Sequence, residues 1–153
     1  WDVPNLLLQK FPAPEFNVST KISLIPGDGK EQRKTGLIIM GRDYAAVTLT
    51  EKEGTFYLQN TQAIKADEGA KEEVLEEIAL KSNTVYLKVA VSAPDAMCQF
   101  SYSENGRNFK KFGAPFKARV GKWIGAKVGL FSISTPEASR GGYADVEYFR
   151  ITK

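Results

Sequence analysis

Glu15-Phe16-Asn17-Val18-Ser19-Thr20-Lys21-Ile22-Ser23-Leu24 is the stretch of sequence that decides the fold. Its apolar residues are Phe16, Val18, Ile22 and Leu24, and the residues between them are mostly polar. Successive side chains of a β-strand point to opposite faces, so this period of two predicts a strand with one buried face and one wet face. Residues 83–92 repeat the pattern and direct Val85, Leu87, Val89 and Val91 inward.

Six further segments have the pattern of strands: residues 35–40, 44–50, 54–59, 97–103, 126–133 and 143–152. Turn chemistry separates several of them. Glu104-Asn105-Gly106-Arg107 contains Asn-Gly, which tolerates the positive φ angles of a tight hairpin, and Pro26-Gly27-Asp28-Gly29 and Glu53-Gly54 mark two more reversals. Many short strands without intervening helices predict an all-β, antiparallel two-sheet β-sandwich. No repeat or linker is visible, so we expect residues 1–153 to form a single domain.

Residues 68–80 fit two different structures. They are rich in helix formers, and Val74 and Ile78 would share one face of a helix. Read at a period of two, the same residues alternate poorly. Propensity alone therefore favours a helix, whereas pairing within a sheet could override it from about Glu73 onward.

Composition excludes several classes of chemistry. The chain has 153 residues and no histidine, which removes the usual general base, the usual zinc ligand and any Ser-His or Cys-His nucleophile pair. Cys98 is the single cysteine, so no intramolecular disulfide can form. It alternates with Phe100 and Tyr102, which predicts a buried structural thiol. No apolar run approaches the roughly 18 residues of a membrane span, so we expect no membrane partner.

We expect no signal peptide within the given sequence, because no basic segment precedes an apolar one at its start. An abrupt beginning at Trp1, with an apolar strand almost at once, is expected of a segment cut from a longer protein.

A basic, aromatic stretch occupies residues 105–136, which contain no acidic residue. Its cations are Arg107, Lys110, Lys111, Lys117, Arg119, Lys122 and Lys127, and its rings are Phe109, Phe112, Phe116, Trp123 and Phe131. Cations and rings are typical of nucleic-acid surfaces. The strand-like spacing of the rings instead predicts a core-facing set, and a net charge of +3 is low for that function. We expect no nucleic-acid partner, and interpret the cations as a solvated face or a surface docked on an acidic domain.

Sugar binding requires exposed flat rings next to planar polar groups. The candidate carbohydrate-binding residues are Tyr44, Arg42, Tyr57, Arg140 and Tyr143. Trp1 and Trp123 could join them, or could pack in the core or at a domain interface.

The acidic residues show no diagnostic spacing. Asp145 and Glu147 would share a strand face, but we interpret Asp145 as a buried polar anchor beside Tyr148 and expect no catalysis by this chain alone. No cofactor is expected. A structural calcium held by turn acids such as Asp28, Asp43 and Asp95 is a weaker hypothesis, since no loop has the spacing of a strong calcium motif. Four glycines are interpreted as bulges or sites of close sheet packing: Gly36, Gly41, Gly125 and Gly129.

Signatures at both ends of the chain point to a family. They are Trp1-Asp2-Val3-Pro4-Asn5-Leu6-Leu7-Leu8-Gln9-Lys10-Phe11-Pro12-Ala13, Gly121-Lys122-Trp123-Ile124-Gly125-Ala126-Lys127-Val128-Gly129-Leu130-Phe131 and Ala144-Asp145-Val146-Glu147-Tyr148-Phe149-Arg150-Ile151. Together they resemble the C-terminal domain of family 43 glycoside hydrolases, the β-xylosidase and α-L-arabinofuranosidase group. The resemblance implies a concanavalin-A-like jelly roll and a strand from about Glu73.

The same resemblance implies a function. In such enzymes a catalytic β-propeller carries the three catalytic acids, and this chain matches only the sandwich that follows it. The chain would be a non-catalytic accessory domain of an enzyme acting on xylan or arabinoxylan, packed on the propeller of the same polypeptide. Trp123, or alternatively Ile124, matches a ring that helps close the active-site pocket, although those relatives carry phenylalanine where this chain has tryptophan. The alternative is an autonomous carbohydrate-binding module for xylan-type polysaccharides. An extracytoplasmic location, periplasmic or secreted, follows from the family alone.

Overall fold

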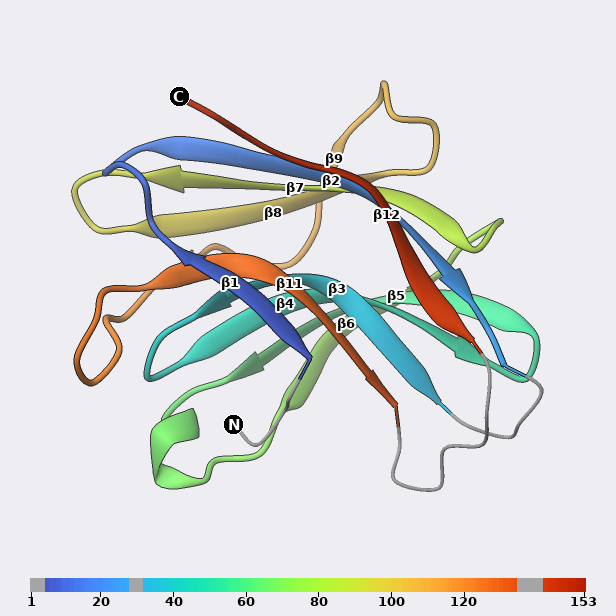
Figure 1. The fold of residues 1–153 in the computed structure, drawn as a ribbon, viewed down its shortest axis with the longest axis horizontal. Coiled ribbons are helices and arrows are strands. Elements are labelled where there is room, and N and C mark those ends of the chain that lie inside the picture. The colour runs from blue at the N-terminus through green and yellow to red at the C-terminus, as the bar shows by residue number, and fades with distance from the viewer. Residues whose placement is uncertain (1–4, 28–31, 135–141) are drawn as a thin grey trace.

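The computed structural model describes residues 5–27, 32–134 and 142–153, and these form two antiparallel six-stranded sheets stacked face to face (Figure 1). The first sheet has the strand order β1 (Leu6–Lys10), β11 (Lys127–Ser134), β3 (Arg33–Met40), β4 (Tyr44–Lys52), β5 (Thr55–Ala63) and β6 (Glu73–Ala79). The second has the order β10 (Phe116–Lys117), β8 (Met97–Ser103), β7 (Thr84–Ser92), β2 (Phe16–Ile25) and β12 (Tyr143–Thr152), and β9 (Lys110–Lys111) pairs with β8. The prediction of an all-β antiparallel sandwich is confirmed.

The core lies between the sheets and is built by the period-two strands. The inward residues of β2 and β7, such as Val18, Ile22 and Leu87, are fully buried and meet Leu37 and Val47 of the first sheet. Each large apolar side chain taken from water contributes roughly 1.5–3 kcal/mol. The alternation visible in the sequence is therefore what drives the two layers together.

Two of the four glycines mark close approaches of neighbouring strands within the first sheet. A Cβ at Gly129 would lie 2.0 Å from the Leu7 carbonyl oxygen, and one at Gly36 would lie 2.0 Å from that of Val47. Both sit in regular register, so close packing rather than a bulge is the reason for glycine. The interpretation is wrong for Gly125, where an added Cβ would meet nothing within 4 Å.

Within residues 68–80, the segment that pairs with β5 forms a strand. The chain makes one short 3-10 turn, η1 (Ala66–Glu68), and then β6, which pairs with β5 along the edge of the first sheet. Ile78 packs against the core opposite Leu58, while Val74 remains half exposed. The expected strand from Glu73 is confirmed, because the backbone pairing to β5 outweighs the helical preference of the glutamates.

The interpretation of Asp145 as a buried anchor is wrong. β12 is the edge strand of the second sheet, and Asp145 lies opposite Ser23 on its outer face, where the side chain is exposed. A register shift between Val146 and Tyr148 also interrupts the strand, and Glu147 forms an ion pair with Lys21. An edge position leaves a carboxylate free to remain in water, so it needs no buried partner.

Two local predictions are confirmed. Cys98 is buried, and its removal from water raises the pKa of the thiol to about 12. Gly106 has the predicted positive φ, at 73°, and the Asn105 side-chain oxygen accepts hydrogen bonds from the backbone of Arg107 and Asn108. The reversal is wider than a tight hairpin, because β8 and β9 begin to pair only at Tyr102 and Lys110. The reversal at Pro26-Gly27-Asp28-Gly29 lies partly outside the described residues. In the described part of the chain, no helix is long and apolar enough to cross a bilayer.

Candidate functional site

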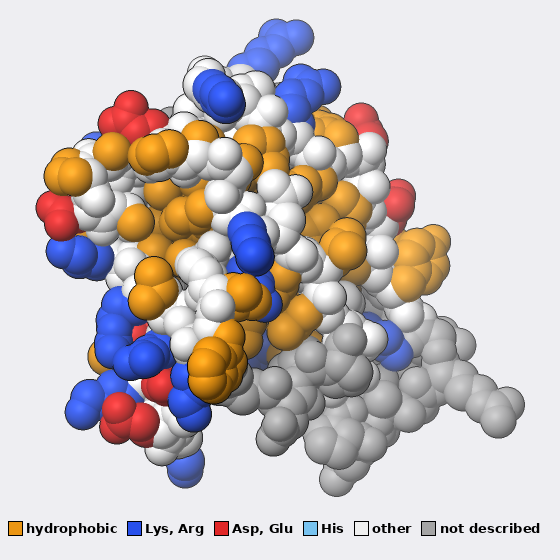
Figure 2. Space-filling view, turned by 60° about the vertical axis from the view of Figure 1, so that its left-hand side comes forward, with side chains coloured by type: hydrophobic (Ala, Val, Ile, Leu, Met, Phe, Trp, Pro, Cys, Tyr) orange, Lys and Arg blue, Asp and Glu red, His pale blue; other side chains and the backbone are white. Residues whose placement is uncertain are grey.

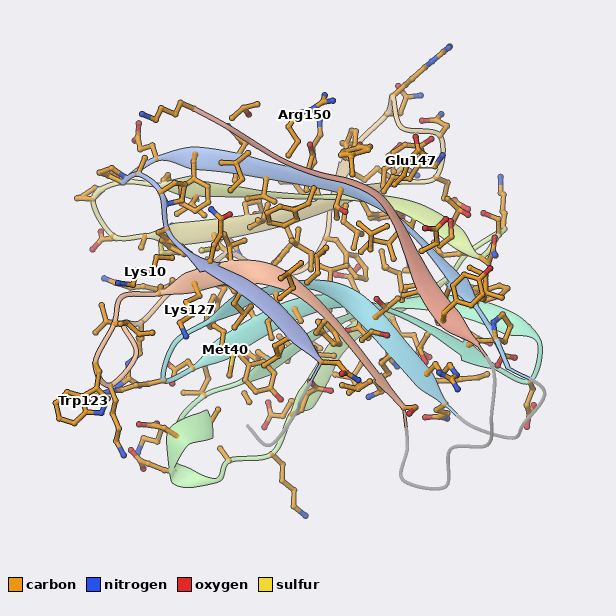
Figure 3. All side chains as sticks on the ribbon, in the orientation of Figure 1. Lys10, Met40, Trp123, Lys127, Glu147 and Arg150 are labelled. Carbon is orange, nitrogen blue, oxygen red and sulfur yellow. The ribbon has the colours of Figure 1, made fainter. Side chains whose placement is uncertain are left out.

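Trp123 is the most exposed of the large hydrophobic side chains that the structure describes, at 93%. It lies in the loop between β10 and β11, residues 118–126, which we call the Trp123 loop, so it does not belong to the core-facing set of rings. Figure 3 shows it projecting from one end of the sandwich, away from both sheets. Phe112 and Phe116 do reach the core as predicted, and Phe131 is buried on the other face of the first sheet. Phe109 is half-buried under the ammonium of Lys88.

Backbone contacts hold both ends of this loop. The Ala118 N–H donates to the Ala96 carbonyl oxygen at 3.0 Å, and the Phe11 N–H donates to that of Ala126 at 3.1 Å. In the loop, Gly41 lets the backbone of Arg119 approach, because a Cβ at Gly41 would lie 1.7 Å from the Arg119 carbonyl oxygen. Gly41 is thus a site of close packing, but against the loop and not within a sheet as predicted.

Asp43 connects the loop to two other segments. The Asp43 residue as a whole is only 3% exposed. Its carboxylate accepts a hydrogen bond from the Lys65 N–H at 2.7 Å and forms an ion pair with Arg119, whose Nη1 lies 3.0 Å from Oδ1 and 3.2 Å from Oδ2. A buried carboxylate needs such partners to remain charged. Asp43 therefore fixes the β3–β4 turn, the segment before η1 and the Trp123 loop in one arrangement. Arg119 was missed as an anchor, since only its position in a basic run marked it.

Two of the acidic residues considered as calcium ligands have other partners, and the third lies outside the described residues. Asp43 is held by Arg119 and Lys65, and Asp95 pairs with Lys117 at 2.8 Å. Asp28 lies outside the described residues. Within residues 5–27, 32–134 and 142–153, no three acidic or thiol side chains converge as metal ligands would.

A cavity of about 220 Å³ lies beside the indole of Trp123. Strand β3 contributes Met40 to it, and β11 contributes Lys127. The remaining lining residues are Gly41 and the loop residues Gly121, Lys122, Trp123, Ile124 and Gly125. The loop turns tightly here, since a Cβ at Gly121 would lie 2.9 Å from the Ile124 carbonyl oxygen. The cavity is therefore lined by apolar side chains and by two lysines, Lys122 and Lys127.

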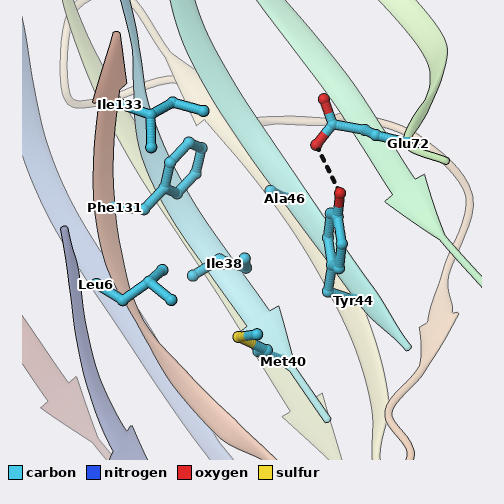
Figure 4. Close-up of a pocket in the computed structure, with 8 residues that line it drawn as sticks. All are labelled: Leu6, Ile38, Met40, Tyr44, Ala46, Glu72, Phe131 and Ile133. Carbon is cyan, nitrogen blue, oxygen red and sulfur yellow. Dashed lines mark hydrogen bonds between the residues drawn. The ribbon is translucent and has the colours of Figure 1, made fainter. Parts of the chain in front are cut away.

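The outer face of the first sheet, turned away from the second sheet, is unusually apolar. Ile38, Ala46 and Phe131 are buried there, and further apolar side chains pack around them: Leu6, Leu8, Met40, Tyr44 and Ile133. Figure 4 shows the shallow pocket that these apolar residues, except Leu8, form with Glu72. One face of an antiparallel sheet is usually left to water and is then polar. We call these eight residues the outer apolar cluster.

Tyr44 borders this pocket with its hydroxyl engaged. The hydroxyl donates to Glu72 Oε2 at 3.1 Å, the contact drawn in Figure 4. Burial, together with the negative charge of Glu72, raises the pKa of Tyr44 above its ordinary value. Glu72 also lies 3.5 Å from Lys34 Nζ. The tyrosine is thus held neutral and oriented.

The candidate carbohydrate-binding residues do not form one site. Tyr44 and Arg42 are neighbours at the β3–β4 turn, where Arg42 Nε lies 4.0 Å from Asp67. Tyr57 is on the same face of the sheet but far from Tyr44. Tyr44 pairs with Ala63 of β5, and Tyr57 precedes Ala63 by six residues, which is about 20 Å at the rise of a strand. The ammonium of Lys52 covers its ring at 5.1 Å. Tyr143 belongs to the edge of the other sheet, and Arg140 and Trp1 lie outside the described residues.

Comparison with known proteins agrees with this architecture. A curated β-xylosidase from Formosa agariphila is 39% identical over 67 residues, which are 44% of this chain and 11% of that protein. The solved structure of a bifunctional GH43-CE protein from Bacteroides eggerthii has a TM-score of 0.80 at 26% identity, over 97% of this chain and 19% of that one. A xylan β-1,4-xylosidase from Bacillus halodurans C-125 shares the fold, with a TM-score of 0.77 at 20% identity over 97% of this chain and 29% of that one.

The chain therefore spans a tenth to a third of the length of these relatives. Residues 1–152 match the family described as the beta xylosidase C-terminal concanavalin A-like domain. With two antiparallel sheets in the arrangement that this name implies, the chain belongs to the family of β-xylosidase C-terminal concanavalin A-like domains.

Proposed function

We propose that this chain is a non-catalytic accessory domain of a family 43 glycosidase that degrades xylan or arabinoxylan. It packs on the catalytic β-propeller of the same polypeptide and places Trp123 at the rim of the active-site pocket. The exposed indole is the observation that carries this proposal. Leaving the 150–250 Å² of a tryptophan in water forgoes roughly 4–6 kcal/mol at about 25 cal/mol per Å². A side chain with that cost, in a loop anchored by a buried ion pair, is suited to contact another surface.

The outer apolar cluster supports a neighbouring domain as well. It presents Phe131, Ile38 and Ile133 on a face that an isolated sandwich would normally make polar. Contiguous apolar surface of this kind marks interaction sites in globular proteins. Its position on the first sheet, the sheet that also carries Met40 and Lys127 of the Trp123 cavity, allows one partner to contact both.

The chemistry of the described residues supports an accessory role rather than catalysis. Glycoside hydrolysis needs two carboxyl groups facing each other across a substrate. Near Trp123 the acids Asp43 and Asp67 are engaged by Arg119 and Arg42. The other acid pair considered, Asp145 and Glu147, lies on the outer face of an edge strand with Glu147 paired to Lys21.

A substitution at Trp123 in the complete enzyme that carries this chain tests the proposal. We expect Trp123→Ala to lower kcat/KM for an aryl xyloside by about 10- to 100-fold, because about 1.4–3 kcal/mol of positioning would be lost. Trp123→Phe should retain most of the activity. The matched control is Tyr143→Ala, an exposed ring on the other sheet, which should leave kcat/KM unchanged. Wild-type kinetics for Trp123→Ala would refute the proposed contact.

The alternative of an autonomous xylan-binding module has less support, because its candidate rings are dispersed and two are occupied by Glu72 and Lys52. Titrating the 153-residue chain with xylohexaose separates the two functions. An accessory domain should show no change in tryptophan fluorescence at millimolar ligand, whereas a module should show saturable quenching.

A further inference from the structure

Three described lysines, at the end of the sandwich that carries Trp123, form no ion pair with a described carboxylate. They are Lys10, Lys122 and Lys127, and in the part of the chain that the structure describes no acidic side chain lies within ion-pair distance of any of them. Lys10 and Lys127 are directly opposite each other in the β1–β11 pair. Directly opposed residues have Cβ atoms about 5 Å apart, and like charges at that spacing destabilise a sheet. The sequence thus retains an unfavourable pair at this end.

The nearby carboxylates are already neutralised. Asp43 is bound by Arg119 at 3.0 Å, Asp67 lies 4.0 Å from Arg42, and Glu68 lies 3.8 Å from Lys65. Glu15 also lies at this end and accepts a hydrogen bond from the Ala93 N–H at 3.3 Å, but in the part of the chain that the structure describes it forms no ion pair with the three lysines. Figure 2 shows Lys and Arg side chains, with some Asp and Glu side chains among them, at the lower left of the visible face beside exposed hydrophobic side chains.

Two of these cations line the cavity next to the indole. Lys122 and Lys127 border the space of about 220 Å³ together with Trp123, Ile124 and Met40. Figure 3 shows Lys10, Lys127, Met40 and Trp123 at the same end of the molecule. The space around Gly125 is open, because this residue has no side chain and even a Cβ there would meet no atom within 4 Å. A flat apolar ring beside two lysines suits a ligand that is part sugar face and part anion.

We propose that this cavity binds a sugar that carries a carboxylate, that is, a uronic acid. The C–H face of the sugar ring packs on the indole of Trp123, and the carboxylate accepts hydrogen bonds from Lys127 and Lys122. Lys10 adds attraction from the neighbouring strand. Binding a carboxylate removes the repulsion between Lys10 and Lys127. A concave site of this size fits one sugar ring better than the flat surface of an acidic protein, which is the competing partner. The site is complete within this chain and does not depend on the proposed contact with a propeller.

Calorimetric titration of the 153-residue chain at low ionic strength tests the proposal. The probes are sodium glucuronate, glucose and sodium acetate. We expect a Kd for glucuronate on the order of millimolar, at least fivefold tighter than for glucose or acetate, because only glucuronate offers both the ring and the charge. Adding 0.5 M NaCl should weaken glucuronate binding severalfold, since exposed ion pairs are screened.

Variants locate the site. Lys127→Gln and Lys122→Gln should each weaken glucuronate binding about three- to tenfold, and Trp123→Ala should abolish it. Lys81→Gln is the matched control, because Lys81 is exposed and lies after β6, at the end of the sandwich opposite Trp123. For each variant, an amide NMR spectrum that changes only near the substituted residue shows that the fold is kept.

Four results would overturn the proposal: no binding of glucuronate, equal binding of glucuronate and glucose, equal binding of glucuronate and acetate, or unchanged binding by Lys127→Gln and Lys122→Gln. Binding of poly-glutamate without binding of glucuronate would also overturn it and would identify an acidic protein as the partner. In each of these cases the proposed function would still stand if Trp123→Ala lowered the activity of the complete enzyme. The two proposals therefore fail independently.

Discussion

Removing the arginine that neutralises Asp43 should destabilise the protein more than removing a shorter but exposed ion pair. Among the described residues, Arg119→Met leaves the Asp43 carboxylate with the Lys65 N–H as its one remaining partner, in a site where the side chain is 4% exposed. Breaking a buried pair from one side costs about 3–5 kcal/mol. Arg119 itself is 46% exposed, so water reaches the vacated position and we reduce the expected cost to about 2–3 kcal/mol.

Thermal and urea unfolding measure this cost. A domain of 153 residues unfolds with an entropy of about 0.3 kcal/mol per K, so 2–3 kcal/mol should lower Tm by about 6–9 °C. A double-mutant cycle of Arg119→Met with Asp43→Asn should give a coupling free energy above about 1 kcal/mol, because the uncharged amide removes the stranded charge.

The control is Lys117→Met. Lys117 and Asp95 are closer, at 2.8 Å, but their side chains are 62% and 60% exposed, so the change should cost less than about 0.5 kcal/mol. If Arg119→Met costs no more than Lys117→Met, or if the cycle is additive, the buried carboxylate is not what holds the Trp123 loop.

Two further predictions concern titratable groups. Cys98 should not react with a thiol reagent at pH 8 until the protein unfolds, because a pKa of about 12 leaves only about one thiolate in 10⁴ and the sulfur is buried; fast labelling of the native protein would contradict this. The raised pKa of Tyr44 contributes stability that is present below about pH 10 and is lost as the pH rises through the folded value. Unfolding free energies measured from pH 8 to 11 should therefore fall less steeply for Tyr44→Phe than for the wild type, and equal slopes would argue against the effect.

The sequence by itself determined the local features of this protein. Alternation along residues 16–24 and 83–92 predicted which side chains of β2 and β7 would enter the core, because facing is decided within a strand by the pleat of its own backbone. The burial of Cys98 and the turn at Gly106 followed in the same way. The family signatures added the jelly roll and the strand from Glu73, which helical propensity alone would have missed.

Only the tertiary structure decided what distant segments do to one another. Asp43 and Arg119 are 76 residues apart, and nothing local to either one reveals that they meet. Asp145 is exposed because β12 is an edge strand, and Trp123 is exposed because its loop is held at the end of the sandwich. Lys10 and Lys127 oppose each other through the β1–β11 register. Exposure and pairing depend on which strands are neighbours, and that order follows from packing the whole chain at once, since long-range contacts repay the entropy of loop closure only when both sheets have formed.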